Sequence, residues 1–288
     1  MAFQPPKSWR ENLAWCLVVL GLLGGWAWTA SASSDQSGTA SPPPLYENLG
    51  TLHHPITTSV PTAQRYFDQG LRLVYAFNHE EAIYSFEEAA RLDPKVAMAY
   101  WGIALALGPN MNAPREKDQE PRAYEAIQRA RALAAQVSVA EQAYIEALAV
   151  RYSLVADAKP EALDMAYAEA MKALSKRFQD DPDAATLAVE ALMDLHPWDY
   201  WTADGEPKPW AEEIVSTLER VLKRYQDHPG ACHFYIHAVE ASNHPERALA
   251  CARRLPSLMP GAGHLVHMPA HIYMRVGQYH EAAERNVQ

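Results

Sequence analysis

The pattern of apolar and polar residues is helical from about residue 60 to the end of the chain. Ala, Leu, Glu and Arg dominate this region, and runs rich in Val, Ile and Thr, which favour strands, are missing. Composition and pattern together predict an all-α fold. In the middle of the chain we expect five helices, over residues 121–136, 139–155, 161–179, 182–195 and 209–226.

Local signals mark the starts of several of these helices. Ser138 is followed three residues later by Glu141, which is the spacing of a capping box. Pro182 and Pro209 each stand where a first helical turn is expected, because the missing N–H of proline costs nothing there. The segment 195–208 is predicted to be an aromatic loop.

Residues 63–96 have the spacing of a helical hairpin that stacks on its neighbours. Small residues stand where helices would touch and large ones where they would fill grooves: Tyr66, Gly70, Ala82, Phe86, Ala89 and Pro94. A second unit follows over 97–107. Parts of the pattern return near the end of the chain, at Ala248, Pro260, Gly277, Tyr279 and Ala282.

These residues give the chain a resemblance to the tetratricopeptide-repeat (TPR) family. The resemblance implies a right-handed α-solenoid of helical hairpins that binds a protein or peptide partner in its concave groove. Regular repeats are then expected over 60–115, irregular helical repeats over 116–228 and His-rich repeats over 229–288. The helical pattern at Gln288 has no capping signal, so we expect the natural protein to continue beyond it.

The first 32 residues have the features of a signal peptide. Lys7 and Arg10 precede an apolar stretch over 13–30, and Ala30-Ser31-Ala32 is a small-residue cleavage pattern. The stretch of about 18 residues is at the lower limit for spanning a membrane, so an uncleaved anchor is the alternative. A Ser/Pro-rich linker and lead-in would cover 33–59. We expect a periplasmic or secreted protein, or else one anchored in the membrane and facing outward.

The net charge bears on the class of partner, and the cysteines raise the question of a disulfide bond. The formal net charge is -10 without a block of like charges, which argues against nucleic acid as a partner. Export would place Cys232 and Cys251 in an oxidising compartment. They lie on consecutive predicted helices, so a disulfide and a pair of buried thiols are both open.

Histidine is concentrated in the last third of the chain, where nine of the twelve histidines lie. Residues four and seven apart share one face of a helix. Two successive helices each present such a face: His233, His237 and Glu240 on the first, and His264, His267 and His271 on the second. In the register that the TPR resemblance implies, both faces line the groove.

Two alignments relate these helices. A repeat of 34 residues pairs His233 with His267, whereas the match of residues 229–231 with 260–262 pairs His233 with His264, 31 residues later. Pro269 is expected to kink the second helix or to start a new one, because proline removes a backbone hydrogen bond. The histidines lie on neighbouring helices in both alignments, and their pairing stays open.

Two imidazoles from one helix and one or more from the next can hold Zn or Cu. His233, His237 and Glu240 alone would form a 2-His-1-carboxylate set for Fe. The segment 233–237 lacks the glutamate of an HExxH metallopeptidase. Histidines on facing helices also bond to Tyr, to Glu and to one another without any metal, so a purely structural role is the alternative.

Other candidates lie outside this cluster. A lid or an additional ligand is considered for His53, His54 and His196, and a place in the core or groove wall for Trp198, Tyr200 and Trp201. Two functions follow. The first is an exported solenoid that binds a protein or peptide, which rests on fold resemblance alone. The second is a metal-binding protein or metal-dependent enzyme, an oxidoreductase or hydrolase, that uses the clustered histidines with Glu240 as ligand or base.

Overall fold

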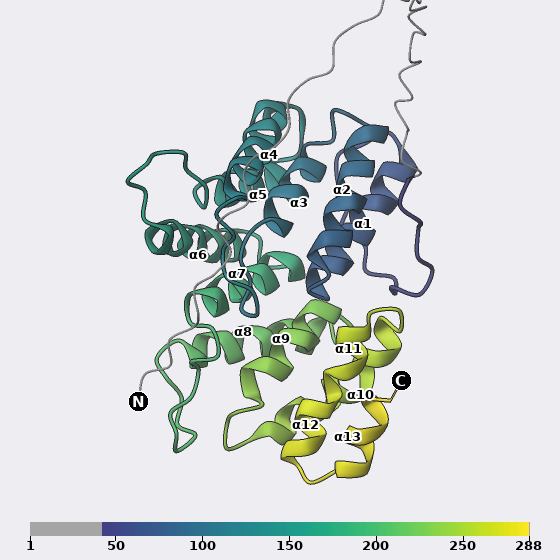
Figure 1. Cartoon of the computed structure of the whole chain (residues 1–288), viewed down its shortest axis with the longest axis vertical. Coiled ribbons are helices and arrows are strands. Elements are labelled where there is room, and N and C mark those ends of the chain that lie inside the picture. Colours follow the sequence, from purple (N-terminus) through teal and green to yellow (C-terminus); the bar gives the residue numbers. More distant parts are fainter. Residues whose placement is uncertain (1–41, 288) are drawn as a thin grey trace, which may run out of the picture. The chain divides into compact units, whose positions relative to one another are not determined.

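Helices make up nearly all the secondary structure of residues 42–287, which are the residues that the computed structural model describes. The predicted all-α fold is confirmed, since this part of the chain contains no β-strand and only two isolated bridges in loops. Each helix packs mainly against the one before it and the one after it (Figure 1). The predicted signal peptide lies outside the described residues. Among the described helices, none has the length and apolar character needed to cross a membrane.

The helices follow the chain in three groups. The N-terminal group comprises α1 (Pro61–Tyr75), α2 (His79–Leu92) and α3 (Ala97–Ala106). The middle group comprises α4 (Glu120–Leu133), the short 3-10 helix η1 (Ala134–Gln136), α5 (Val139–Ala149), α6 (Pro160–Arg177), α7 (Pro182–Leu195) and α8 (Ala211–Arg224). The C-terminal group comprises α9 (Pro229–Val239), the 3-10 helix η2 (Pro245–Ala248), α10 (Leu249–Leu258), α11 (Gly263–His267), α12 (Pro269–Arg275) and α13 (Tyr279–Arg285).

The predicted helix starts are correct in two places and wrong in one. Ser138 and Glu141 form the predicted capping box at the start of α5, and Pro182 lies in the first turn of α7. Pro209, in contrast, precedes α8, which begins at Ala211. The reason is the loop before it: Lys208 donates its backbone N–H to the carbonyl of Tyr200, so this stretch belongs to the loop and not to the helix.

Helix α5 ends at Ala149, six residues before the predicted end. Just beyond this point the side chain of Arg151 turns inward and is almost fully buried. Its guanidinium donates to Asp164 at 2.9 Å and to Asp194 at 2.8 Å. A buried charge is tolerated only when it is paired in this way, so the pairing holds the chain out of helical register at this point.

The helical hairpin predicted over 63–96 is present as α1 and α2. The ring of Phe86 on α2 fits between Gly70 of α1 and Gly102 of α3. A Cβ atom at either glycine would overlap that ring, so the two glycines allow the helices to pack closely. The predicted close contact at Gly70 is therefore confirmed.

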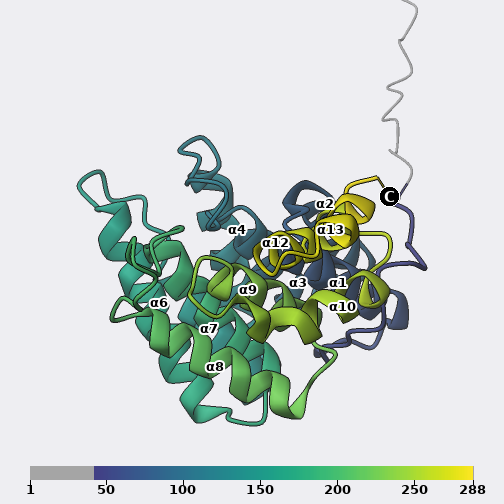
Figure 2. The same ribbon diagram turned by 90° about the horizontal axis from the view of Figure 1, so that it is seen from below.

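Helix α9 joins the two ends of the described chain. It contacts α8 and α10, its neighbours in sequence, and also α1, α7 and α12 (Figures 1 and 2). Gly230 makes the contact with α1 close, because a Cβ atom there would overlap the ring of Tyr75. Residues that are far apart in sequence thus meet around α9.

Residues 42–59, the described part of the predicted linker and lead-in, contain no helix but pack against the helices. The carbonyl groups of Pro43 and Pro44 accept hydrogen bonds from Tyr66 and Gln69 of α1. Leu49 is buried in the core. This segment is therefore part of the folded unit and not a free spacer.

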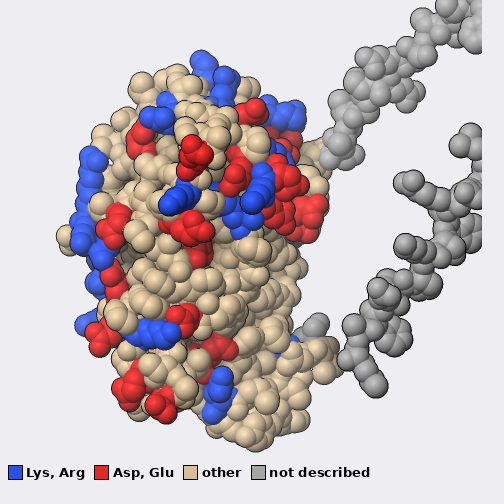
Figure 3. Space-filling view, turned by 60° about the vertical axis from the view of Figure 1, so that its left-hand side comes forward, with Lys and Arg blue, Asp and Glu red and all other residues tan. Residues whose placement is uncertain are grey.

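The surface shown in Figure 3 carries both signs of charge. In the upper part and along the left side of this face, Lys and Arg side chains are interspersed with Asp and Glu side chains, whereas a broad area toward the lower right carries few charges. The pattern agrees with the spread of charge along the sequence, in which no block of one sign occurs.

Candidate metal centre

The five clustered histidines come together in the structure. Helix α9 carries His233 and His237, helix α11 carries His264 and His267, and helix α12 carries His271. Pro269 starts α12, so the prediction that it begins a new helix is the correct one of the two alternatives. The pairing follows the 31-residue alignment, because Nε2 of His233 lies 3.0 Å from Nε2 of His264.

A buried hydrogen-bond network fixes the start of α9. His228 caps the helix: its Nδ1 accepts from the backbone N–H of Ala231, so its Nε2 donates to Asp183, at 3.1 Å. Asp183 also accepts from the hydroxyl of Tyr75 at 2.6 Å and from Nδ1 of His54 at 2.8 Å. Burial alone would raise the pKa of Asp183, but the hydrogen bonds from His228 and His54 outweigh it and hold this pKa well below its usual range. The network ties α9 to α1 and α7.

Glu240, the C-terminal capping residue of α9, orients two of the imidazoles. Its two carboxylate oxygens accept from Nδ1 of His237 at 2.9 Å and from Nδ1 of His271 at 2.6 Å. Burial would raise the pKa of Glu240, but these two hydrogen bonds lower it to about 2. The group is therefore an ionised carboxylate at neutral pH and can only accept hydrogen bonds. In their neutral form, both imidazoles therefore carry their proton on Nδ1 and a lone pair on Nε2.

The same tautomer is imposed on two further histidines. Nδ1 of His233 donates to the backbone carbonyl of Tyr75 at 2.7 Å. Nδ1 of His267 donates to the amide oxygen of Asn286 at 2.6 Å, and that amide is held in place because its nitrogen donates to the carbonyl of Ala282. Imidazoles that bind metals are commonly oriented in this way, with the distal nitrogen donating to a carboxylate or carbonyl and the other nitrogen free to coordinate.

Three of the imidazoles converge on one point. Ligand nitrogens of His233, His237 and His264 all lie within 4.8 Å of one another. Nε2 of His237 is buried and has no hydrogen-bond partner among the described residues. A buried polar atom without a partner is costly, and a lone pair held in this state is suited to coordinate a cation. The residues present therefore fit a metal ion.

Burial keeps these three imidazoles neutral. It lowers the pKa of His233 well below its ordinary value, and the neighbouring His237 and His264 add to the effect. Burial likewise lowers the pKa of His237, and it lowers that of His264 to about 4 with help from His237. Because metal ions bind the neutral form, none of the three rings has to give up an extra proton to the solvent at neutral pH.

Two aromatic side chains border the cluster from loops. The ring of Phe77, in the turn between α1 and α2, packs against His233 with ring centroids 4.6 Å apart and against His264 at 5.4 Å. Trp198 contacts His237 edge-on at 5.0 Å and is 51% exposed. Both aromatic residues have positive φ angles, 57° and 62°, which are strained for bulky side chains and concentrate at functional sites.

The other candidates from the sequence have different partners. His53 bonds to Asp68, and His54 is buried against Asp183, so both serve the packing of α1 and α7. His196 stacks flat on Trp210, with ring centroids 3.7 Å apart.

The aromatic loop is fastened to the helices at two points. Tyr200 is buried in the core, as expected for a core aromatic residue. Trp201 donates from its indole N–H to the carbonyl of Ala238, in the last turn of α9. These contacts place Trp198, on the same loop, at the rim of the cluster and not in the core.

Sequence reasoning missed the residues that orient the imidazoles. Tyr75, Phe77 and Asn286 act through a backbone carbonyl, a ring in a turn and a side-chain amide, and none of them stands in a recognisable motif. His228 carried a local signal that could have been used, because it directly precedes Pro229 at a helix start.

The two cysteines lie side by side, as the consecutive helices predicted. Cys232 on α9 and Cys251 on α10 are buried free thiols with their sulfur atoms 2.7 Å apart. The hydrogen bond with Cys251 raises the pKa of the Cys232 thiol, and burial adds to this effect.

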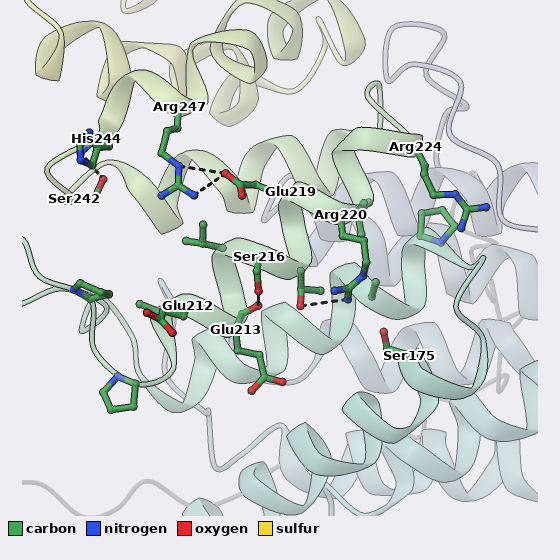
Figure 4. Close-up of a pocket in the computed structure, with 18 of the residues that line it drawn as sticks. Ser175, Glu212, Glu213, Ser216, Glu219, Arg220, Arg224, Ser242, His244 and Arg247 are labelled. Carbon is green, nitrogen blue, oxygen red and sulfur yellow. Dashed lines mark hydrogen bonds and ion pairs between the residues drawn. The ribbon is translucent and has the colours of Figure 1, made fainter.

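A large groove lies elsewhere, along α8 (Figure 4). Its volume is about 1220 Å³. Two ion pairs lie within its lining: Arg247 donates to Glu219 at 2.7 Å, and Arg224 donates to Asp180 at 2.6 Å. Charged residues of both signs line the groove, and none of the five clustered histidines does.

These features define the chain as an all-helical protein with a centre of converging imidazoles. Compared with known proteins, the chain matches no protein-family model and no curated protein. Its function is therefore inferred from the geometry of the site.

Proposed function

We propose that this protein binds a transition-metal ion through Nε2 atoms of His233, His237 and His264. The observation that carries the proposal is the buried Nε2 of His237, whose lone pair has no partner and is fixed by the hydrogen bond from Nδ1 to Glu240. All three ligands are imidazoles, which suit Zn and Cu and do not suit Mg or Ca.

An iron site of the 2-His-1-carboxylate type is less well supported. Both oxygens of Glu240 already accept hydrogen bonds, from His237 and from His271. A metal ion bound to this carboxylate would have to displace one of them. Glu240 is therefore assigned the role of orienting the ligands and not of binding the ion.

The proposed ligand set also leaves room for chemistry. Three imidazoles occupy three positions of a tetrahedral ion, and the fourth is then available to water or to another ligand. Zinc bound in this way lowers the pKa of its water to about 7. Whether the protein is an enzyme would depend on what binds at that fourth position.

Metal analysis of two variants tests the proposal. The full chain is produced without a polyhistidine tag, stripped with a chelator and dialysed against Zn or Cu, and bound metal is measured by elemental analysis. We expect His264→Asn to lose the tightly bound ion. His244→Asn is the matched control, because His244 is exposed and bonds only to Glu246 and to the turn that contains it. A wild-type protein that retains no metal would refute the proposal, and so would a His264→Asn variant that binds it with unchanged affinity.

We also propose, as a second function, that the chain forms a TPR-like right-handed α-solenoid and binds a peptide segment of a partner protein. Two observations favour it: the close packing of Phe86 between Gly70 and Gly102, and the groove of about 1220 Å³ along α8. A peptide library screened against the full chain and against an Arg220→Glu variant tests it. If Arg220→Glu leaves peptide binding unchanged, the groove along α8 is excluded as the binding surface.

Export is the remaining part of the proposal. The basic start, the apolar stretch and Ala30-Ser31-Ala32 support cleavage after residue 32. N-terminal sequencing of the protein from its native cell envelope should begin at Ser33. A start at residue 1 or 2 in a membrane fraction would instead indicate an anchor.

A further inference from the structure

A second pair of imidazole nitrogens faces each other beside the site proposed above. Nε2 of His267, the last residue of α11, lies 3.1 Å from Nε2 of His271 on α12. The Nδ1 atoms of both rings are occupied, since His267 donates to the amide oxygen of Asn286 and His271 donates to the carboxylate of Glu240. Neither acceptor can donate a proton in return.

Because of this arrangement, two neutral rings cannot form a hydrogen bond between their Nε2 atoms. When both rings are neutral, each carries its single proton on Nδ1, and two lone pairs then point at each other across 3.1 Å. Two lone pairs at this separation repel unless a proton or a metal ion lies between them. The first pair, His233 and His264, differs in this respect, because Nδ1 of His264 has no acceptor among the described residues. This ring can carry its proton on Nε2 and donate to His233, or carry it on Nδ1 and offer Nε2 to a metal ion.

The separation of the two nitrogens suits a metal ion. Metal–imidazole bonds of about 2.0–2.1 Å place two nitrogen ligands about 2.9 Å apart at a right angle and about 3.3 Å apart at a tetrahedral angle. The observed 3.1 Å lies between these values. The pair therefore has the spacing of two ligands of one ion.

We propose that His267 and His271 bind a second metal ion, distinct from the ion of His233, His237 and His264. This inference rests on the proposed function. The mutually close ligand atoms of the first site include neither His267 nor His271, whereas His271 forms a second close set with His237 and Glu240. The protein would thus hold two ions on two neighbouring groups of imidazoles.

Glu240 connects the two sites. One of its oxygens accepts from His237, a ligand of the first ion, and the other accepts from His271, a ligand of the second. A metal ion makes the opposite N–H of its imidazole a stronger donor, so an ion bound at one site changes the charge that the carboxylate presents to the other. The two ions are therefore coupled through one carboxylate.

The second ion is the more accessible one. The side chain of His271 is 27% exposed, whereas that of His237 is 1% exposed. Two protein ligands leave at least two positions of a tetrahedral ion for water or small molecules. We expect this ion to bind more weakly, to exchange faster and to be the one that an external ligand reaches.

Titration of the metal-free full chain with Co(II) tests the inference, because Co(II) commonly replaces Zn(II) and its visible absorption reports coordination. The wild-type chain should take up two equivalents, the second more weakly. His267→Asn should remove only the second equivalent and leave the absorption of the first unchanged. Asn286→Ala, which removes the acceptor of His267 Nδ1, should weaken the second equivalent alone. His280→Asn is the control, because this exposed histidine pairs only with Glu284.

The outcomes separate this inference from the proposed function. Uptake of a single equivalent that both His264→Asn and His267→Asn abolish would mean one shared ion, and the second site would be refuted while metal binding stands. A single equivalent that only His264→Asn abolishes would likewise refute the second site. No uptake by a folded wild-type chain, with helical content checked by circular dichroism, would refute both.

Discussion

Replacing Glu240 by Gln should weaken metal binding although Glu240 itself binds no metal. The carboxylate accepts from two imidazoles at once. An amide has only one acceptor oxygen, and its NH₂ group would face the N–H of the other ring. That ring must then move its proton from Nδ1 to Nε2 in order to accept from the amide, and a protonated Nε2 cannot coordinate a metal.

The exposure of the two rings indicates which site should lose more metal affinity. His237 is almost fully buried, so its N–H cannot turn to water and should keep the amide oxygen. His271 is 27% exposed and tolerates the loss better. Loss of such an orienting partner typically costs about 10- to 100-fold in metal affinity, or about 1.4–2.7 kcal/mol. We expect a loss of this size at the His267–His271 site and a smaller one at the other.

Competition with a chromophoric chelator for Zn(II) measures both affinities. Glu246→Gln is the matched control, because Glu246 accepts from the exposed His244 and contacts none of the clustered histidines; its affinities should stay within about twofold of wild type. The reasoning would be refuted if Glu240→Gln, with unchanged helical content, bound both ions as tightly as the wild-type chain. A loss confined to the His233–His237–His264 site would show that the amide oxygen stays with His271 instead.

Three further outcomes are expected. Oxidised glutathione should convert Cys232 and Cys251 to a disulfide, so that both titratable thiols are lost. The free energy of unfolding should rise by about 3 kcal/mol, whereas a Cys251→Ser chain should show no rise. Burial raises the pKa of Glu190 to about 8, so the folded chain keeps a proton that the unfolded chain loses above about pH 4.5. The free energy of unfolding should therefore fall as the pH rises from 4.5 to 8. Denaturant unfolding at pH 5 and pH 8 measures this fall, and Glu190→Gln should make it smaller. Gly230→Ala should place a methyl group against the ring of Tyr75 and cost about 1–3 kcal/mol in thermal unfolding; a neutral result would contradict the close packing of α1 and α9.

The positions of the histidines on their helices could be predicted because they follow from spacing alone. His233 and His237 are four residues apart, so any helix places them on one face. The match between residues 229–231 and 260–262 also contained the correct pairing, since equivalent helix starts place His233 opposite His264. Repetition of a local pattern was thus a better guide than an ideal repeat length.

The partners that orient the imidazoles could not be predicted in the same way. The Tyr75 carbonyl and the Asn286 amide reach the site through tertiary contacts, and a backbone carbonyl has no sequence signature at all. Trp198 was expected in the core or groove wall because of its size. Its positive φ angle, which is set by the loop around it, turns it toward the rim.

The carbonyl of Tyr75 orients an imidazole that lies 158 residues further along the chain. A ribosome makes this carbonyl long before it makes His233, and the last ligands come later still. The centre therefore forms only after both segments have been made, and it exists only when α1 has docked onto α9. A chain that is exported unfolded would acquire its metal after transport, so the compartment in which it folds would decide which metal it carries.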